Sequence, residues 1–383
     1  MSQLFRPFSI SISDSTLHDL RSRLEHTRWP EEATVKDWSQ GVPLSVVQDL
    51  CTYWIEQYDW RHCEKRLNSY PQFVTEIDGV DIHFLYIRSK HSNALPMIMT
   101  HGWPGSIIEF TKVIEPLTDP TEHGATEQDA FHLILPTLPG YGFSGKPTTN
   151  GFTSARIAIA WTELMTRLGF ERWVAQGGDW GADVVAALAS NSPPTSLAAV
   201  HMNTAFFDAK KETRWAKTLS SGEERALELW ERWERTESAY LLQQGTRPQT
   251  LGYSLADSPS GLLAWLFEKI SVWSQHKGKD VFSVLSREEI LDDIMIYWLT
   301  NTGTSSARLY WENLDATDLP IDIPVAVSQF PGDQTYVPRS WGERYYKNII
   351  HWHDVEEGGH FAAWESPGLF VRELRACFAH IRQ

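Results

Sequence analysis

The segment Gly177-Gly178-Asp179-Trp180-Gly181 constrains the fold more than any other part of this chain. It follows the apolar run Trp173-Val174-Ala175 and precedes Ala182-Asp183-Val184-Val185, where a helix is expected to begin. Small residues on both sides of Asp179 permit a very sharp turn. The pattern therefore predicts a strand, a tight turn with Asp179 at its tip and a helix, an arrangement that exposes the aspartate as a nucleophile.

An aspartate in this position restricts the reactions that the chain can catalyse. A serine that opened an alkyl electrophile would leave an ether, which water does not readily cleave. A carboxylate leaves an ester, which an activated water molecule can hydrolyse. Asp179 therefore favours substrates attacked at saturated carbon, such as epoxides or alkyl halides, over esters and amides.

Composition narrows the classes of partner. The 383 residues carry a net charge of −15, which argues against nucleic acids and anionic membranes as partners. The three cysteines lack the spacing of a disulfide framework, so we expect reduced thiols in a soluble, cytoplasmic protein. No signal peptide and no membrane anchor are expected. The 18 tryptophans favour an aromatic, apolar pocket, although each one singly is best explained by core packing.

The order of strand and helix patterns predicts the architecture. From about residue 91 they alternate, which indicates a mostly parallel sheet with helices on both faces. Eight strands are expected, the first two forming a hairpin at Asp78-Gly79. Residues 1–90 are predicted to form an N-terminal layer, and 91–204 and 320–383 the two parts of the core. Residues 205–319 are predicted to form a helical lid, inserted after the sixth strand and covering the carboxyl ends of the strands. Within it, Glu223 to Leu242 is expected to form one helix.

Two further residues complete a candidate catalytic triad with Asp179. Asp333 follows the expected strand at 324–330, and His360 lies on a loop after the last expected strand. The chain order of nucleophile, acid and histidine is one that such a triad adopts, and the carboxyl ends of neighbouring parallel strands lie close together. We therefore expect His360 to act as the base and Asp333 to orient it.

The segment His101-Gly102-Trp103-Pro104-Gly105-Ser106 follows the first core strand. We expect the backbone N–H groups of Trp103 and Trp180 to form an oxyanion hole that stabilises charge on an ester carbonyl. The side chains of Trp103, Trp180 and Phe361 are expected to line the substrate pocket.

Opening an epoxide also requires a proton donor for the departing oxygen. Tyr253 and Tyr310 in the predicted lid are the candidates, although composition alone favours an ordinary residue of an amphipathic lid helix at each position. His351 and His353 share one face of a strand, but nothing in the sequence completes a set of metal ligands. No metal and no cofactor are expected.

Taken together, these motifs resemble the epoxide hydrolases of the α/β-hydrolase superfamily, in the microsomal-type and fungal branch that carries an N-terminal meander. The resemblance covers nearly the whole chain and includes Gly252-Tyr253, Asp257-Ser258-Pro259-Ser260-Gly261 and Gly358-Gly359-His360-Phe361. It implies the α/β-hydrolase fold, Asp179 as nucleophile, Tyr253 and Tyr310 as activators of the epoxide oxygen, His360 with Asp333 as base and acid, and a small-molecule epoxide as substrate. The oligomeric state stays open, with a homodimer as one arrangement.

Two other functions remain as alternatives. A haloalkane dehalogenase shares the aspartate and histidine but uses halide-binding Trp or Asn donors instead of a tyrosine pair. A non-catalytic relative would bind a small apolar ligand without turnover; the full set of five candidate side chains argues against it.

Overall fold

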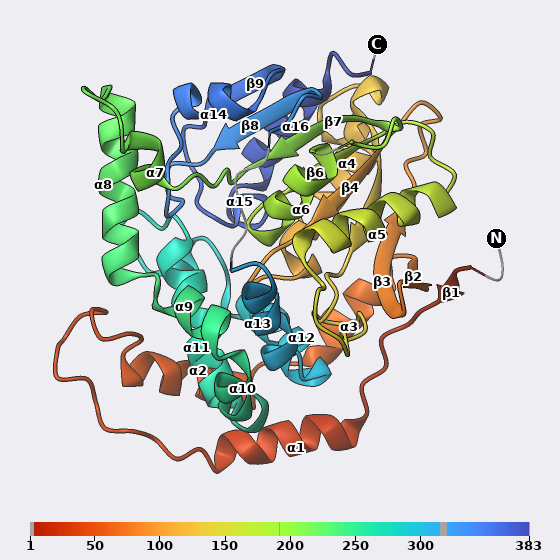
Figure 1. Ribbon diagram of the computed structural model, residues 1–383. Helices are drawn as coiled ribbons and strands as arrows, with labels where there is room; N and C mark the ends of the chain where they lie inside the picture. Colours follow the sequence, from red (N-terminus) through yellow and green to blue (C-terminus); the bar gives the residue numbers. More distant parts are fainter. Residues whose placement is uncertain (1–3, 191, 315–319, 383) are drawn as a thin grey trace.

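A nine-stranded sheet forms the centre of the molecule (Figure 1). The computed structural model describes residues 4–190, 192–314 and 320–382. The strand order is β1-β2-β3-β5-β4-β6-β7-β8-β9; β1–β3 pair antiparallel, β3 pairs antiparallel with β5, and the remaining pairs are parallel. The strands are β1 (Arg6–Pro7), β2 (Gln72–Ile77), β3 (Val80–Ile87), β4 (Leu95–Thr100), β5 (Phe131–Pro136), β6 (Trp173–Gly177), β7 (Leu197–Met202), β8 (Val325–Gln329) and β9 (Ile349–Asp354).

The α/β-hydrolase architecture expected from the sequence is confirmed. All eight expected strands are present as β2 to β9, and the hairpin turns at Asp78-Gly79, where both residues have positive φ. The expected number of strands was too low by one. Strand β1 has only two residues, and its pairing with β2 is a tertiary contact that no sequence alternation announces.

Helices cover both faces of the sheet, with α5 and α6 on one face and α4 and α16 on the other (Figure 1). Helix α5 carries an apolar stripe that includes Ile157, Trp161 and Leu164, all fully buried. Four short 3₁₀ helices within the described residues add to the loops: η1 (Ile107–Phe110), η2 (Pro120–His123), η3 (Glu127–Asp129) and η4 (Val281–Ser283). The core helices are α4 (Ile114–Thr118), α5 (Ser154–Arg167), α6 (Trp180–Ala189), α14 (Arg339–Tyr345), α15 (Ala362–Glu365) and α16 (Pro367–Phe378).

A group of helices between β7 and β8 forms the lid at the carboxyl ends of the strands (Figure 1). Its members are α7 (Ala209–Thr213), α8 (Ser221–Thr236), α9 (Ala239–Thr246), α10 (Pro248–Asp257), α11 (Pro259–Trp273), α12 (Arg287–Thr300) and α13 (Gly303–Glu312). The last positions of the predicted lid, 315–319, lie outside the described residues. One continuous helix was expected from Glu223 to Leu242. The structure instead ends α8 at Thr236, because the Ser238 hydroxyl donates to Glu234 O at 2.7 Å and competes with the helical backbone bonds.

The N-terminal layer lies against the lid. It consists of α1 (Asp14–Glu25), α2 (Leu44–Glu56) and α3 (Trp60–Asn68), and α1 runs beneath α10 in Figure 1. Arg66 Nη2 lies 2.6 Å from Oδ2 of the buried Asp292 in the lid, and the Tyr58 hydroxyl donates to Asp292 Oδ1 at 2.7 Å. These contacts fix helices of the N-terminal layer to α12.

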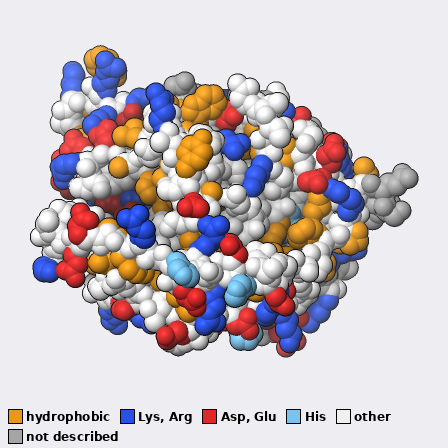
Figure 2. All heavy atoms as spheres, turned by 90° about the horizontal axis from the view of Figure 1, so that it is seen from below, with side chains coloured by type: hydrophobic (Ala, Val, Ile, Leu, Met, Phe, Trp, Pro, Cys, Tyr) orange, Lys and Arg blue, Asp and Glu red, His pale blue; other side chains and the backbone are white. Residues whose placement is uncertain are grey.

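The surface on this side carries mixed charge. Figure 2 shows acidic and basic side chains interspersed over the lid and the N-terminal layer. Such a distribution does not offer the continuous basic patch that nucleic acid binding requires. No helix in the described ranges is both long and apolar enough to cross a bilayer.

Candidate active site

Asp179 occupies the tip of a strained turn between β6 and α6. Its backbone has φ 51° and ψ −131°, an uncommon conformation for a residue other than glycine. A Cβ on Gly177 would lie 2.1 Å from Gly181 O, and one on Gly181 would lie 2.0 Å from Thr100 O. Only glycine fits at either position, so the small residues noted in the sequence are required for close packing of this turn.

The carboxylate of Asp179 is held from two sides. The backbone N–H of Trp103 donates to Asp179 Oδ1 at 2.8 Å, and His360 Nε2 lies 3.5 Å from Asp179 Oδ2. The loop after β4 and the loop after β9 therefore meet at the nucleophile. The backbone N–H of Trp180 follows Asp179 directly at the start of α6, and its role as a second donor stays a prediction.

His360 and Asp333 form a buried hydrogen-bonded pair. His360 Nδ1 lies 2.9 Å from Asp333 Oδ1, while Asp333 accepts further bonds from Thr204 Oγ1 at 3.1 Å and from the Gln334 N–H at 2.8 Å. Burial lowers the pKa of His360, but the carboxylates of Asp333 and Asp179 more than offset this and raise it well above 6.5. In this arrangement Asp333 fixes the ring so that Nε2 faces the nucleophile.

The loop that carries His360 is tied to the end of lid helix α11. The His360 N–H donates to Trp273 O at 3.0 Å, and the Gly358 N–H donates to Gln275 Oε1 at 2.8 Å. Glu365 in turn accepts from the Gln275 N–H at 2.7 Å. The position of the base thus depends on the lid as well as on the core.

Tyr310 on α13 lies beside Trp180, the residue that follows the nucleophile, and its role in activating an epoxide stays a prediction. It is 4% exposed, and its ring meets that of Trp180 edge to face with centroids 4.8 Å apart. Its hydroxyl has no hydrogen-bond partner among the described residues. A buried hydroxyl left unpaired is available for a substrate oxygen.

The structure does not bring Tyr253 into this site. Tyr253 is 71% exposed and lines a groove on the outer surface with Lys146 and Arg308. The reason lies in its neighbour Gly252, which is buried so close to α13 that a Cβ would lie 2.2 Å from Thr304 Oγ1. Successive residues of a helix point about 100° apart, so the contact at Gly252 turns Tyr253 towards solvent.

Tyr240 on α9 is a buried lid tyrosine that contacts the residues around the nucleophile. Its ring stacks on Trp103 with centroids 5.2 Å apart and meets Tyr310 edge to face at 5.8 Å. Burial, and then the charge of Asp179, raise the pKa of both Tyr240 and Tyr310 well above 10. Both hydroxyls therefore keep their protons at neutral pH and can donate hydrogen bonds towards the nucleophile.

Two family descriptions match the chain: epoxide hydrolase N terminus over residues 5–110 and alpha/beta hydrolase fold over residues 96–367. Epoxide hydrolase 1 of Sus scrofa is 34% identical over 99% of this chain and 89% of its own length. The chain belongs to the epoxide hydrolase family. A protein of Stigmatella aurantiaca is 53% identical over 98% of this chain and 85% of its own length.

Solved epoxide hydrolases share the fold of the whole enzyme. The Aspergillus niger epoxide hydrolase superposes with a TM-score of 0.88 at 34% identity, covering 98% of this chain and 96% of that one. The juvenile hormone epoxide hydrolase of Bombyx mori superposes with a TM-score of 0.90 at 29% identity, covering 99% of this chain and 95% of that one. The similarity includes the N-terminal layer and the lid, so these parts belong to the family fold.

Aromatic side chains surround the nucleophile of this epoxide hydrolase. Trp103 is 1% exposed and has Trp265 and Trp273 within 6.4 Å, between ring centroids. Phe361 is buried beside His360, with ring centroids 5.0 Å apart. The expected aromatic environment is therefore present, although most of it comes from the lid.

Sequence reasoning missed Tyr240 in the enzyme because no motif surrounds it; it lies on α9, which the sequence had merged into a longer helix.

His101, in the predicted oxyanion loop, does not serve as a base. It accepts from the Leu138 N–H through Nε2 at 3.2 Å, its Nδ1 lies 3.0 Å from Gly102 O, and burial lowers its pKa to about 4.

The histidine pair considered as metal ligands has a third neighbour in the structure. His351 Nε2 and His353 Nδ1 lie 2.9 and 3.0 Å from the same atom, Glu373 Oε2. The Ser328 hydroxyl also donates to this oxygen, at 3.0 Å. Although burial opposes it, these bonds lower the pKa of Glu373 to about 2. The group is explained by its own hydrogen bonds, and the absence of a metal stays a prediction.

Proposed function

We propose that this enzyme converts an apolar epoxide to a vicinal diol in two half-reactions through an ester on Asp179. The observation that carries the proposal is the position of the Asp179 carboxylate. The Trp103 N–H donates a hydrogen bond to this carboxylate, and His360 lies beside it. The negative charge of the carboxylate also contributes to raising the pKa of Tyr240 and Tyr310. This is the set of groups that opening an epoxide and then hydrolysing an ester requires.

In the first half-reaction, Asp179 Oδ2 attacks a ring carbon of the epoxide. Oδ1 is the oxygen bound by the Trp103 N–H, so Oδ2 is the freer nucleophile and Oδ1 becomes the carbonyl oxygen of the ester. Tyr240 and Tyr310 donate hydrogen bonds to the epoxide oxygen and supply its proton as the ring opens, which replaces a poor alkoxide leaving group by a hydroxyl.

In the second half-reaction, water attacks the ester carbonyl carbon of Asp179. The Trp103 N–H, and we propose the Trp180 N–H with it, stabilise the charge that develops on Oδ1. Formation of the ester also removes the negative charge of Asp179, which is one of the causes that raise the pKa of His360. The pKa of His360 therefore falls once the ester has formed, and its proton can restore the tyrosine that was deprotonated in the first half-reaction. His360 is then neutral and able to accept a proton from water, while Asp333 keeps it oriented.

The lining favours apolar substrates. Aromatic rings such as Trp103, Trp265 and Trp273 gain free energy by covering apolar surface, and offer little to a charged ligand. Relatives include juvenile hormone epoxide hydrolases of Ctenocephalides felis, 34–35% identical over 96% of this chain. We propose bulky apolar epoxides as the substrate class. The haloalkane alternative is disfavoured, because two protonated tyrosines suit an epoxide oxygen.

The test is diol formation from racemic styrene oxide and a series of aliphatic epoxides, with Asp179→Ala in parallel. We expect diol from the wild type and none above background from the variant. Diol from both would exclude Asp179 as nucleophile, and halide release from 1-haloalkanes without diol formation would favour the dehalogenase. A cytoplasmic location and a homodimer stay predictions. Cell fractionation tests the location, and light scattering tests the oligomeric state.

A further inference from the structure

A small cavity lies on the core side of Asp179. It offers about 10 Å³ to the centre of a water molecule, which is close to the space that one water needs. Among the described residues, its lining comes from the core alone and includes Gly102, Glu109, Asp179, His360 and Ala363. Neither Tyr240 nor Tyr310 contributes, so this cavity is distinct from the region beneath the lid tyrosines.

Glu109 is the acidic residue of this cavity that the mechanism does not use. It lies on η1, shortly after the loop that carries Trp103, and its carboxyl packs on Gly105, where a Cβ would lie 1.5 Å from Glu109 Oε1. No hydrogen bond or ion pair within the described chain reaches this carboxyl. The side chain is half-buried and forms part of the cavity lining.

A largely buried carboxyl that has no hydrogen-bond partner in the protein needs water as its hydrogen-bond partner. Burial and the negative charges of Asp293 and Asp179 raise the pKa of Glu109 well above 4.5. The neutral acid can both donate and accept a hydrogen bond, and it does not repel the Asp179 carboxylate across the cavity.

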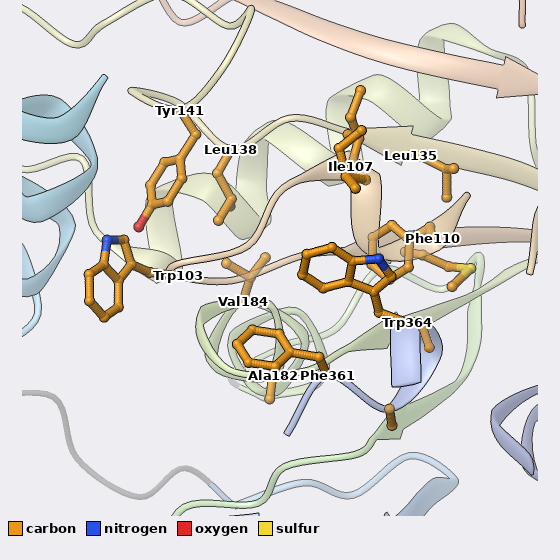
Figure 3. Close-up of a cluster of buried hydrophobic side chains, with 14 of the residues drawn as sticks. Trp103, Ile107, Phe110, Leu135, Leu138, Tyr141, Ala182, Val184, Phe361 and Trp364 are labelled. Atoms are coloured by element: carbon orange, nitrogen blue, oxygen red, sulfur yellow. The ribbon is translucent and has the colours of Figure 1, made fainter. Parts of the chain in front are cut away.

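The remaining walls combine apolar side chains with the polar side chains of Thr100, His101 and Asn203. Figure 3 shows Trp103 and Tyr141 on one side of this part of the core, and Phe110, Phe361 and Trp364 on the other. Phe110 and Phe361 line the cavity itself. Thr100, His101 and Asn203 already accept hydrogen bonds from other residues of the protein. A water molecule here can therefore be held by Glu109, His360 and Asp179.

We propose that Glu109 holds the hydrolytic water in this cavity, so that it attacks the ester from the side opposite the lid tyrosines. The proposal rests on the two-step function above. The water oxygen bonds to Cγ of Asp179 while one of its protons passes to His360 Nε2. As the bond between Cγ and Oδ2 breaks, Oδ2 leaves as the second hydroxyl of the diol and takes that proton. The carboxylic acid left on Asp179, which now contains the oxygen of the water, gives its remaining proton to His360. In this arrangement the water already occupies the cavity when the epoxide binds.

The experiment separates the two half-reactions by rapid quench and intact mass, following the Asp179 ester in Glu109→Leu, Glu109→Gln and the control Glu115→Gln. Glu115 lies on the neighbouring α4 and is exposed. In Glu109→Leu we expect ester formation within about twofold of wild type and ester hydrolysis slowed about 30-fold or more. The ester then accumulates, and kcat and KM fall together. Glu109→Gln, whose amide can still hold water, stays within about threefold of wild type, as does the control.

Two results would overturn the inference: hydrolysis at the wild-type rate in Glu109→Leu, or an equal slowing of both steps. If this variant does not fold, Ala363→Val fills the same cavity from α15 and keeps Glu109. It should slow hydrolysis selectively, and unchanged hydrolysis would refute the proposal. Failure of the underlying function is distinguishable, because then no epoxide would form an ester even in His360→Gln.

Discussion

The ring of Tyr240 stacks on that of Trp103, with centroids 5.2 Å apart and planes inclined by 7°. Through its backbone N–H, the same tryptophan holds Asp179 Oδ1 at 2.8 Å. One residue of the core thus links the nucleophile to a tyrosine of the lid. Movement of α9 relative to the core would therefore move the Tyr240 ring relative to Trp103 and the nucleophile.

The three tyrosines should differ in how much each contributes to the rate of ester formation. We expect Tyr240→Phe and Tyr310→Phe each to slow ester formation about 10- to 100-fold, and the double variant by about 1,000-fold or more, because a proton donor to the departing oxygen is lost. Tyr253→Phe is the matched control on the exposed face of α10 and should stay within about twofold of wild type. Single-turnover ester formation measures this. A silent Tyr240→Phe together with an inactive Tyr253→Phe would reverse the assignment.

Loss of the base should trap the intermediate. His360→Gln keeps the nucleophile and the tyrosines, so the ester should form and then hydrolyse about 10²- to 10⁴-fold more slowly. Intact-mass measurement should find an increase equal to the mass of the epoxide. Asp333→Asn should show a smaller accumulation, because His360 remains but loses its charged partner. Normal diol release from His360→Gln would exclude it as the base.

The raised pKa of His360 predicts how stability changes with pH. The folded protein binds this proton more tightly than the unfolded chain, whose histidine titrates near 6.5. The stabilisation is therefore complete below about pH 6.5 and is lost as the pH rises through the higher folded-state value. Thermal denaturation of the wild type and His360→Gln at pH 6 and pH 9 should give a smaller advantage for the wild type at pH 9. An advantage that grows with pH would contradict the assigned shift.

The contact between the N-terminal layer and the lid should contribute to stability. Arg66→Leu leaves the buried carboxylate of Asp292 without its cation, and we expect a cost of about 2–3 kcal/mol in the free energy of unfolding, since Arg66 itself is partly exposed. Asp292→Asn in the same chain should recover part of this loss. Arg21→Leu breaks an exposed pair with Glu25 and should cost at most about 0.5 kcal/mol. Urea denaturation measures these changes in the free energy of unfolding. Equal losses in Arg66→Leu and Arg21→Leu would contradict a specific role for Asp292.

Local sequence was sufficient for much of the fold and for the triad. The strands from β2 to β9 follow from hydrophobic patterning, and the turn at Asp179 follows from glycines that no other residue could replace. Asp333 and His360 could be assigned because they follow strands, and parallel strands bring their carboxyl ends together. These features depend on residues close together in the chain, or on general rules of sheet topology.

Only the tertiary structure decided which tyrosine faces the nucleophile and where the unpaired acid of the core lies. Tyr253 has a recognisable sequence context but is turned outwards by the packing of Gly252 on α13, while Tyr240 has none and is turned inwards. Glu109 belongs to the site because the loops after β4 and β9 close a cavity around it. The direction of a helical side chain is fixed by contacts with distant segments. Sequence spacing alone therefore identifies candidate side chains but does not determine which of them converge.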